Sequence, residues 1–81
     1  MLLHHSLALA ASDHFSDSRA FVIEAKAVVR NGQLEESPEL FKATDGTELL
    51  VLDRKGDFLE VETNLGEKGW IHSGDVELLT P

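Results

Sequence analysis

The chain contains no cysteine and no tyrosine, and it has only 2 prolines among its 81 residues. Without cysteine there is no disulfide framework, no thiolate nucleophile and no cysteine-ligated zinc site, so the folded state depends on apolar packing alone. A chain this short buries only about 60 % of the surface that its unfolded form exposes. The sequence therefore predicts a single small domain with a thin core.

Basic residues are also scarce. The chain has 7 Lys and Arg against 15 Asp and Glu, which gives a formal net charge of −8 and an isoelectric point near 4.7. Proteins that bind nucleic acid need clustered Lys and Arg to neutralise phosphates and release counterions. The composition therefore argues against nucleic acid as a partner, and it restricts membrane contact to an anchor elsewhere in a parent chain.

Long apolar runs are missing too, since a membrane-spanning helix takes about 20 such residues. The apolar stretch MLLHHSLALA at residues 1–10 is broken by two histidines and a serine, and no Lys or Arg precedes it as in a signal peptide. Two interpretations stay open: the cut end of a membrane or signal segment from a longer parent, or a flexible start with weakly packing leucines. A polar linker follows, so we assign residues 1–19 to an N-terminal segment and residues 20–81 to the folded domain.

What the rest of the chain does contain is a series of short β-branched and aliphatic runs separated by Gly, Asn and Asp, the pattern of a small barrel or sandwich. No α-helix is expected after residue 20, because no stretch keeps the apolar spacing of a helix. Ser73-Gly74-Asp75 is expected to form a single 3₁₀ turn. The predicted strand runs are 21–23, 27–30, 40–43, 49–52, 58–63, 69–72 and 76–79, with a long polar loop at 31–38.

Several motifs stand in a fixed order along this region: Val29-Arg30-Asn31-Gly32, Asp45-Gly46-Thr47, Gly56-Asp57-Phe58-Leu59, Gly69-Trp70-Ile71-His72-Ser73 and the ending Val76-Glu77-Leu78-Leu79. Their order and spacing resemble the bacterial SH3 (SH3b) family from about residue 21 to residue 79. The chain also resembles the SH3-like domain at the C-terminus of the membrane-anchored BatE-type aerotolerance proteins. The resemblance implies an all-β fold, a small SH3-like partly open barrel of about five strands with a short 3₁₀ turn before the last strand.

The same resemblance implies which side chains form the core. They are Val29, Leu40 or Phe41, Ala43, Leu49, Val51, Leu59, Val61, Ile71 and Val76. Burying such side chains stabilises the folded state by about 1.5–3 kcal/mol each, against a chain entropy of similar total size.

Eukaryotic SH3 domains bind proline-rich helices on a shelf of aromatic side chains. Matched residue by residue, the shelf positions hold Phe58, His72 and Asp75 here, so the aromatic shelf is largely missing and a proline-rich ligand is not expected. A mixed patch remains, and its predicted binding residues are Phe58, Trp70, His72, Asp75 and Glu36, with Glu35 and Glu39 on the same loop. An acidic loop beside aromatic side chains favours a basic or amide-bearing ligand, through charge-assisted hydrogen bonds and cation–π contacts.

Two residues of this patch have alternative roles. Trp70 can simply pack under the long loop and hold it down. Phe58 alternates with Leu59 and Val61 along its strand, so we expect its ring to face solvent or a partner.

Catalytic and metal-binding groups are not expected to meet in this chain. His72 and Ser73 are adjacent, so on a strand their side chains point to opposite faces and cannot act as base and nucleophile. His4 and His5 have no third ligand at metal spacing, and no phosphate or calcium loop pattern is present. We therefore expect a non-enzymatic module with no cofactor and no metal.

Three functions stay open at this point. The first is a protein–protein interaction domain of a larger bacterial envelope protein, extracytoplasmic and anchored to the membrane through that parent. The second is a cell-wall targeting domain that binds peptidoglycan peptides. The third is a structural spacer that packs on another domain of the same parent.

Overall fold

A computed structural model of the chain describes residues 18–79, and the predictions made for residues 1–17 lie outside this range. Within the described range, no helix has the length and apolarity that crossing a membrane requires. The elements are β1 (Arg19–Val22), β2 (Lys26–Arg30), β3 (Glu39–Thr44), β4 (Glu48–Lys55), β5 (Phe58–Glu62), β6 (Lys68–His72), the 3₁₀ turn η1 (Ser73–Asp75) and β7 (Val76–Leu79).

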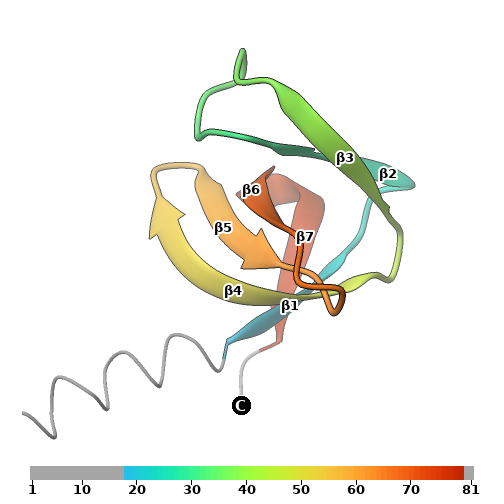
Figure 1. Cartoon of the computed structure of the whole chain (residues 1–81). Helices are drawn as coiled ribbons and strands as arrows, with labels where there is room; N and C mark the ends of the chain where they lie inside the picture. Colours follow the sequence, from blue (N-terminus) through green and yellow to red (C-terminus); the bar gives the residue numbers. More distant parts are fainter. Residues whose placement is uncertain (1–17, 80–81) are drawn as a thin grey trace, which may run out of the picture.

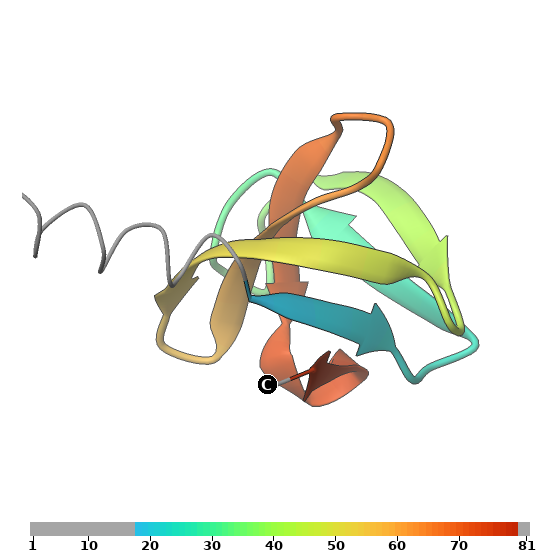
Figure 2. The ribbon, with the colours of Figure 1, turned by 90° about the horizontal axis from the view of Figure 1, so that it is seen from below.

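The 7 strands form one antiparallel sheet in the order β3-β2-β6-β5-β4-β1-β7. The sheet rolls up into a small open barrel (Figure 1), and the view from below shows β1 lying alongside β4 (Figure 2). The all-β class, the partly open barrel and the 3₁₀ turn before the last strand are confirmed. The strand number exceeds the expected five because β2 and β3, on either side of the long loop, pair as a hairpin of their own.

The longest strand, β4, bends strongly as it crosses from one side of the barrel to the other (Figure 1). Its pairing with β5 shifts register between Val51 and Asp53, which marks a β-bulge at Leu52. A bulge increases the local bend and twist of a strand. The first part of β4 can therefore pair with β1 while its last part continues along β5. β4 contains the predicted strand run 49–52.

Buried apolar side chains from β1 to β7 fill the interior of the barrel. They are Ala20, Val22, Ala27, Val29, Ala43, Leu49, Val51, Leu59, Val61, Ile71 and Val76. Every core residue that the sequence predicted without an alternative is among them, and between Leu40 and Phe41 it is Phe41 that packs against this cluster. Leu40 is 49 % exposed. Ala20 and Val22 were missed because β1 lies between β4 and β7, which no local pattern reveals.

The turn after β3 has the geometry expected from its sequence. Gly46 has φ = 86°, a left-handed conformation that glycine adopts without a steric cost because it has no Cβ. The amide of Gly46 donates to the carbonyl of Val22 at 2.7 Å, and the amide of Val22 donates to the carbonyl of Thr47 at 2.9 Å. The turn therefore also fixes the end of β1.

Candidate functional site

A pocket of about 290 Å³ opens where β2, the long loop, the start of β5 and η1 meet. We call it the Phe58 pocket, and its lining residues are Lys26, Val28, Arg30, Glu35, Phe58, His72 and Asp75. It brings together three of the predicted binding residues, Phe58, His72 and Asp75. The other two, Trp70 and Glu36, do not line it.

Strand pairing places Phe58 and His72 side by side, because they face each other across β5 and β6. Their ring centroids lie 5.4 Å apart at an interplanar angle of 76°, an edge-to-face contact. We predicted that Phe58 faces solvent or a partner, and exposure to solvent is wrong, since the residue is only 7 % exposed. Phe58 does not belong to the central core cluster, which agrees with the alternation of inward and outward side chains along β5. The ring is nevertheless covered, since His72 packs on it and side chains of β2 and the long loop share its pocket.

Replacing Phe58 by leucine is expected to lower the free energy of unfolding by about 1 kcal/mol, because leucine fills much of the space but loses the aromatic contact with His72. Chemical unfolding of the wild type and the variant measures this loss. The same substitution in a His72→Ala background should cost clearly less, because the contact is then already absent. Equal losses in both backgrounds would show that the two rings do not interact.

His72 also organises the 3₁₀ turn. It is the N-cap residue of η1, and its Nδ1 accepts a hydrogen bond from the amide of Gly74 at 3.0 Å. The amide of Ser73 donates to the carbonyl of Asp57 at 2.8 Å, and the carbonyl of Asp75 accepts from the amide of Ile23 at 2.9 Å. These bonds tie η1 to the β4–β5 turn and to the end of β1. Asp75 is therefore held in place at the wall of the pocket.

The long loop forms the opposite wall and is fastened by Arg30. The Nη1 atom of Arg30 donates to the carbonyl of Ser37 at 2.9 Å, and the amide of Asn31 donates to the carbonyl of Pro38 at 2.8 Å. Glu35 of this loop lines the pocket, whereas the predicted Glu36 is exposed and lies outside the lining. The two residues occupy one turn, and consecutive side chains in a turn point in different directions. The positions of Glu35 and Glu36 in the sequence therefore could not predict which of the two lines the pocket.

Trp70 lies in the next row of the sheet, facing Arg30 on β2 and Glu60 on β5. It is half-buried and is not part of the pocket lining. The row that contains Trp70 adjoins the row of Phe58 and His72, since both rows belong to the same face of β5 and β6. Trp70 therefore extends the face beside the pocket rather than the pocket itself.

Three lining residues were missed by the sequence reasoning: Lys26, Val28 and Arg30. They alternate with the buried Ala27 and Val29 along β2. That alternation was visible in the sequence for Val28 and Arg30, which it placed on the outer face of the predicted run 27–30, whereas Lys26 lay outside that run. What it could not reveal is that β2 lies beside the end of β6, which brings this face next to His72.

The pocket walls carry charges of both signs. Lys26 and Arg30 come from β2, and Glu35 and Asp75 come from the long loop and η1. Among the described residues, the ion pairs within 4.0 Å are Arg19 with Glu48 at 3.9 Å and Lys42 with Glu39 at 2.7 Å, so none joins two charges of the pocket. Lys26, Glu35 and Asp75 therefore remain available to a ligand around an apolar floor of Phe58 and Val28. Arg30 donates one N–H to Ser37 and keeps its other N–H groups for a ligand.

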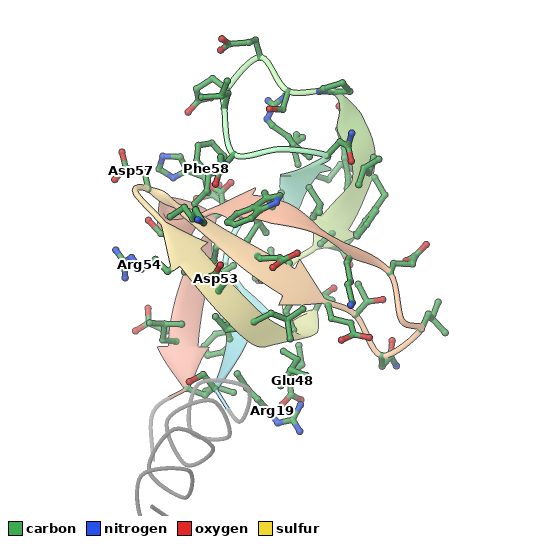
Figure 3. The ribbon with its side chains drawn as sticks, turned by 60° about the vertical axis from the view of Figure 1, so that its left-hand side comes forward. Arg19, Glu48, Asp53, Arg54, Asp57 and Phe58 are labelled. Atoms are coloured by element: carbon green, nitrogen blue, oxygen red, sulfur yellow. The ribbon has the colours of Figure 1, made fainter. Side chains whose placement is uncertain are left out.

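A larger groove of about 650 Å³ lies elsewhere, lined by Arg19, Thr47, Glu48, Leu50, Glu62, Thr63 and Asn64. Arg19 and Glu48 lie well apart from Asp57 and Phe58 (Figure 3). This groove has no aromatic side chain and includes none of the predicted binding residues. The Phe58 pocket, with its aromatic floor and convergent polar groups, is therefore the better candidate site.

No protein-family model, curated protein or solved structure matches this chain. Within residues 18–79, no group of three or more His, Cys, Asp or Glu side chains is placed to hold a metal ion. The chemistry of the Phe58 pocket follows from its own side chains: an apolar floor, two cations, two carboxylates and one histidine.

Proposed function

We propose that this chain is a bacterial SH3-like domain that acts as a non-catalytic interaction module and binds a peptide segment of a partner protein in the Phe58 pocket. One observation carries the proposal. The residues at the SH3 shelf positions, Phe58, His72 and Asp75, converge on one pocket together with Glu35 of the long loop. Binding sites combine an apolar floor with a few convergent polar groups in this way.

The size and charge of the pocket indicate the kind of ligand. At about 290 Å³ it holds one or two residues of an extended chain and is too small for a folded surface. Its mixed charges suit a segment that carries amide and charged groups, and Arg30 and Glu35 can pair with opposite charges on it. The net charge of −8 attracts a basic segment from a distance. The expected ligand is therefore a basic, amide-rich peptide segment.

The absence of catalysis in this proposal is supported by the state of the histidine. A general base needs a free ring nitrogen, and Nδ1 of His72 already accepts the amide proton of Gly74. In the neutral ring the remaining nitrogen, Nε2, then carries the proton and is a donor. His72 can therefore bind and position a ligand through its Nε2–H donor while Nδ1 is engaged with the backbone of η1.

We also propose the kind of protein in which this domain occurs. The resemblance to SH3b domains and to BatE-type proteins, together with the apolar residues 1–10, supports an extracytoplasmic domain of a larger envelope protein that is anchored to the membrane through its parent chain. The partner is then another envelope protein or a neighbouring domain of the same parent. Peptidoglycan peptides are the alternative ligand.

A nuclear magnetic resonance titration of the ¹⁵N-labelled full chain tests the proposal. The probes are synthetic twelve-residue peptides that are basic, acidic or proline-rich but matched in length. The basic peptides are expected to shift the amide resonances of Lys26, Phe58 and Asp75, and the proline-rich ones to have no effect. Shifts confined to the groove around Arg19 and Glu48 would refute the assignment of the site. Sedimentation with purified peptidoglycan, if positive, would replace the protein partner by the cell wall.

The Glu35→Lys variant is expected to weaken the binding of a basic peptide about fivefold, since a charge at a pocket rim contributes about 1 kcal/mol. Isothermal titration calorimetry measures the change. Glu67→Lys is the matched control, because Glu67 is also an exposed loop glutamate but lies outside the Phe58 pocket. An equal loss in both variants would show that only the overall charge matters.

A further inference from the structure

We propose that the free edge of β7 is a second interaction surface, which binds an extended segment of a partner protein whose apolar residues alternate with Lys or Arg. β7 is one of the two edge strands of the sheet: β1 pairs with it on one side, and within residues 18–79 no strand pairs with it on the other. It lies at the rim of the barrel beside β1 (Figure 2). An edge strand of this kind can take up a further strand through its backbone groups.

The backbone of β7 directs bonding groups at this free edge. The amide of Ile23 donates to the carbonyl of Asp75 at 2.9 Å, in register with the β1–β7 pair. In an antiparallel pair, residues that bond to the partner strand alternate with residues whose backbone groups point away from it. Val76 and Leu78 therefore point away from β1. The N–H of Val76 is bonded within η1, so the groups left for a new strand are the carbonyl of Val76 and both backbone groups of Leu78.

A pocket of about 330 Å³ borders the same edge. We call it the β7 pocket, and its lining residues are Arg54, Leu59, Ser73, Val76, Glu77 and Leu78. None of them belongs to β1, so the pocket opens on the side of β7 away from β1. Leu59 and Val76 are buried, whereas Leu78 is 43 % exposed although its pairing partner Ala20 is buried in the core. An apolar side chain of a bound strand can fill this opening and cover Leu78.

The two edges of the sheet are protected to different degrees. On β3 the Nζ atom of Lys42 lies 2.7 Å from Glu39, and the pairing of β3 with β2 shifts register between Val29 and Arg30. Charged side chains, lysine above all, and bulges keep an edge from pairing with other chains. β7 contains no Lys and no Pro, and its register with β1 is regular. Of the two edges, β7 is therefore the one that favours strand addition.

The side chains of β7 define the segment that fits. Val76 and Leu78 point to the inner side of the strand, and Glu77 between them points to the outer side and is exposed. A strand paired with β7 repeats this alternation, with apolar residues beside Val76 and Leu78 and a Lys or Arg opposite Glu77. A second copy of the chain would bring its own net charge of −8 and be repelled. The occupant is therefore a basic segment of another protein.

This surface shares no residue with the Phe58 pocket, so the proposal does not depend on the function proposed for that pocket. β7 has only 4 residues, which limits strand pairing to a few hydrogen bonds. The apolar side chain in the β7 pocket and the pairing with Glu77 have to supply the rest of the affinity.

A nuclear magnetic resonance titration of the ¹⁵N-labelled full chain tests the proposal. The probe is a synthetic eight-residue peptide in which valine alternates with lysine, and its control has the same composition with all lysines placed before the valines. The alternating peptide is expected to shift the amide resonances of Arg54, Val76 and Leu78 and to slow the hydrogen exchange of the Leu78 amide. The control peptide has the same charge but cannot present one apolar face as a strand, so it should leave these resonances unchanged.

The Leu78→Lys variant places a charge in the β7 pocket and is expected to weaken the binding of the alternating peptide at this edge at least about tenfold. Shifts that the peptide causes at Lys26 and Phe58 should be the same as in the wild type. Leu65→Lys is the matched control, because Leu65 is 81 % exposed in the β5–β6 turn and lies outside both pockets. An equal loss in the two variants would show that the added charge acts from a distance.

The exposed Glu77 allows a second variant that leaves the pocket itself unchanged. Glu77→Lys is expected to reverse the preference of the edge, so that a peptide alternating valine with glutamate binds better than the lysine peptide. Glu67→Lys changes the net charge by the same amount outside the β7 pocket and should keep the preference for lysine.

Four results would overturn the proposal: no shift at Leu78 with the alternating peptide, shifts confined to the Phe58 pocket, shifts confined to β3, or a Leu78 amide that already exchanges slowly in the free chain. In the last case, protection that grows with protein concentration would assign the edge to a second copy, and constant protection would assign it to residues of the same chain. Binding at β7 without any shift in the Phe58 pocket would refute the proposed function and keep the second surface.

Discussion

Replacing Ile71 by alanine is expected to lower the free energy of unfolding by about 3 kcal/mol. The side chain of Ile71 is fully buried and faces Val29 on β2 and Leu59 on β5, both of which are buried as well. The substitution removes methyl and methylene groups from the centre of the sheet and leaves a cavity that these neighbours can only partly fill. Small domains unfold with about 5–15 kcal/mol, and one this size belongs near the low end, so the variant should lose much of its stability.

Urea unfolding followed by Trp70 fluorescence or circular dichroism measures this loss. The matched control is Ile23→Ala, since Ile23 is 45 % exposed. That variant removes the same atoms from a site in contact with water and is expected to cost less than about 1 kcal/mol. Similar losses in the two variants would mean that Ile71 is not at the centre of the core.

Replacing Gly69 by alanine is expected to cost about 2–3 kcal/mol, although it adds a single methyl group. A Cβ atom at this position would lie 2.5 Å from Cγ1 of Val29, 3.0 Å from the carbonyl oxygen of Arg30 and 3.3 Å from Cδ1 of Leu40. Val29 is fully buried, and the carbonyl belongs to the backbone of β2, so neither can move freely. The glycine is therefore required by the close approach of β2 and β6 and not by an unusual backbone angle, since its φ is not positive.

Thermal and urea unfolding test this prediction, and Val29→Ala provides the internal control. If the clash with Val29 causes the loss, the double variant Gly69→Ala/Val29→Ala should be more stable than the sum of the two single losses predicts. Strict additivity would show that the methyl group is accommodated by another route. The contact also explains why Gly69 precedes Trp70 in the motif: the strand must come close to its neighbour at this residue.

The candidate site shows how far sequence reasoning reaches. Phe58, His72 and Asp75 could be selected beforehand because the motifs that resemble SH3 domains align these three residues with the positions of the SH3 shelf. Their convergence required β6 to lie between β2 and β5, a long-range arrangement. Glu35 instead of Glu36, and the part played by Arg30 in fastening the loop, depend on the path of the loop in space. The order of residues along the chain does not predict that path.

The amino-acid sequence by itself determined the all-β class, the position of each strand run, the 3₁₀ turn at Ser73 to Asp75 and most of the core, because alternation and turn chemistry act over a few residues. Only the tertiary structure decided what covers each face. Alternation places Phe58 on the outer side of β5, yet the ring is buried because His72 packs on it and distant segments share its pocket. The physical reason is that a side chain's direction is fixed by its own backbone, whereas its burial depends on residues that the chain brings back from far away.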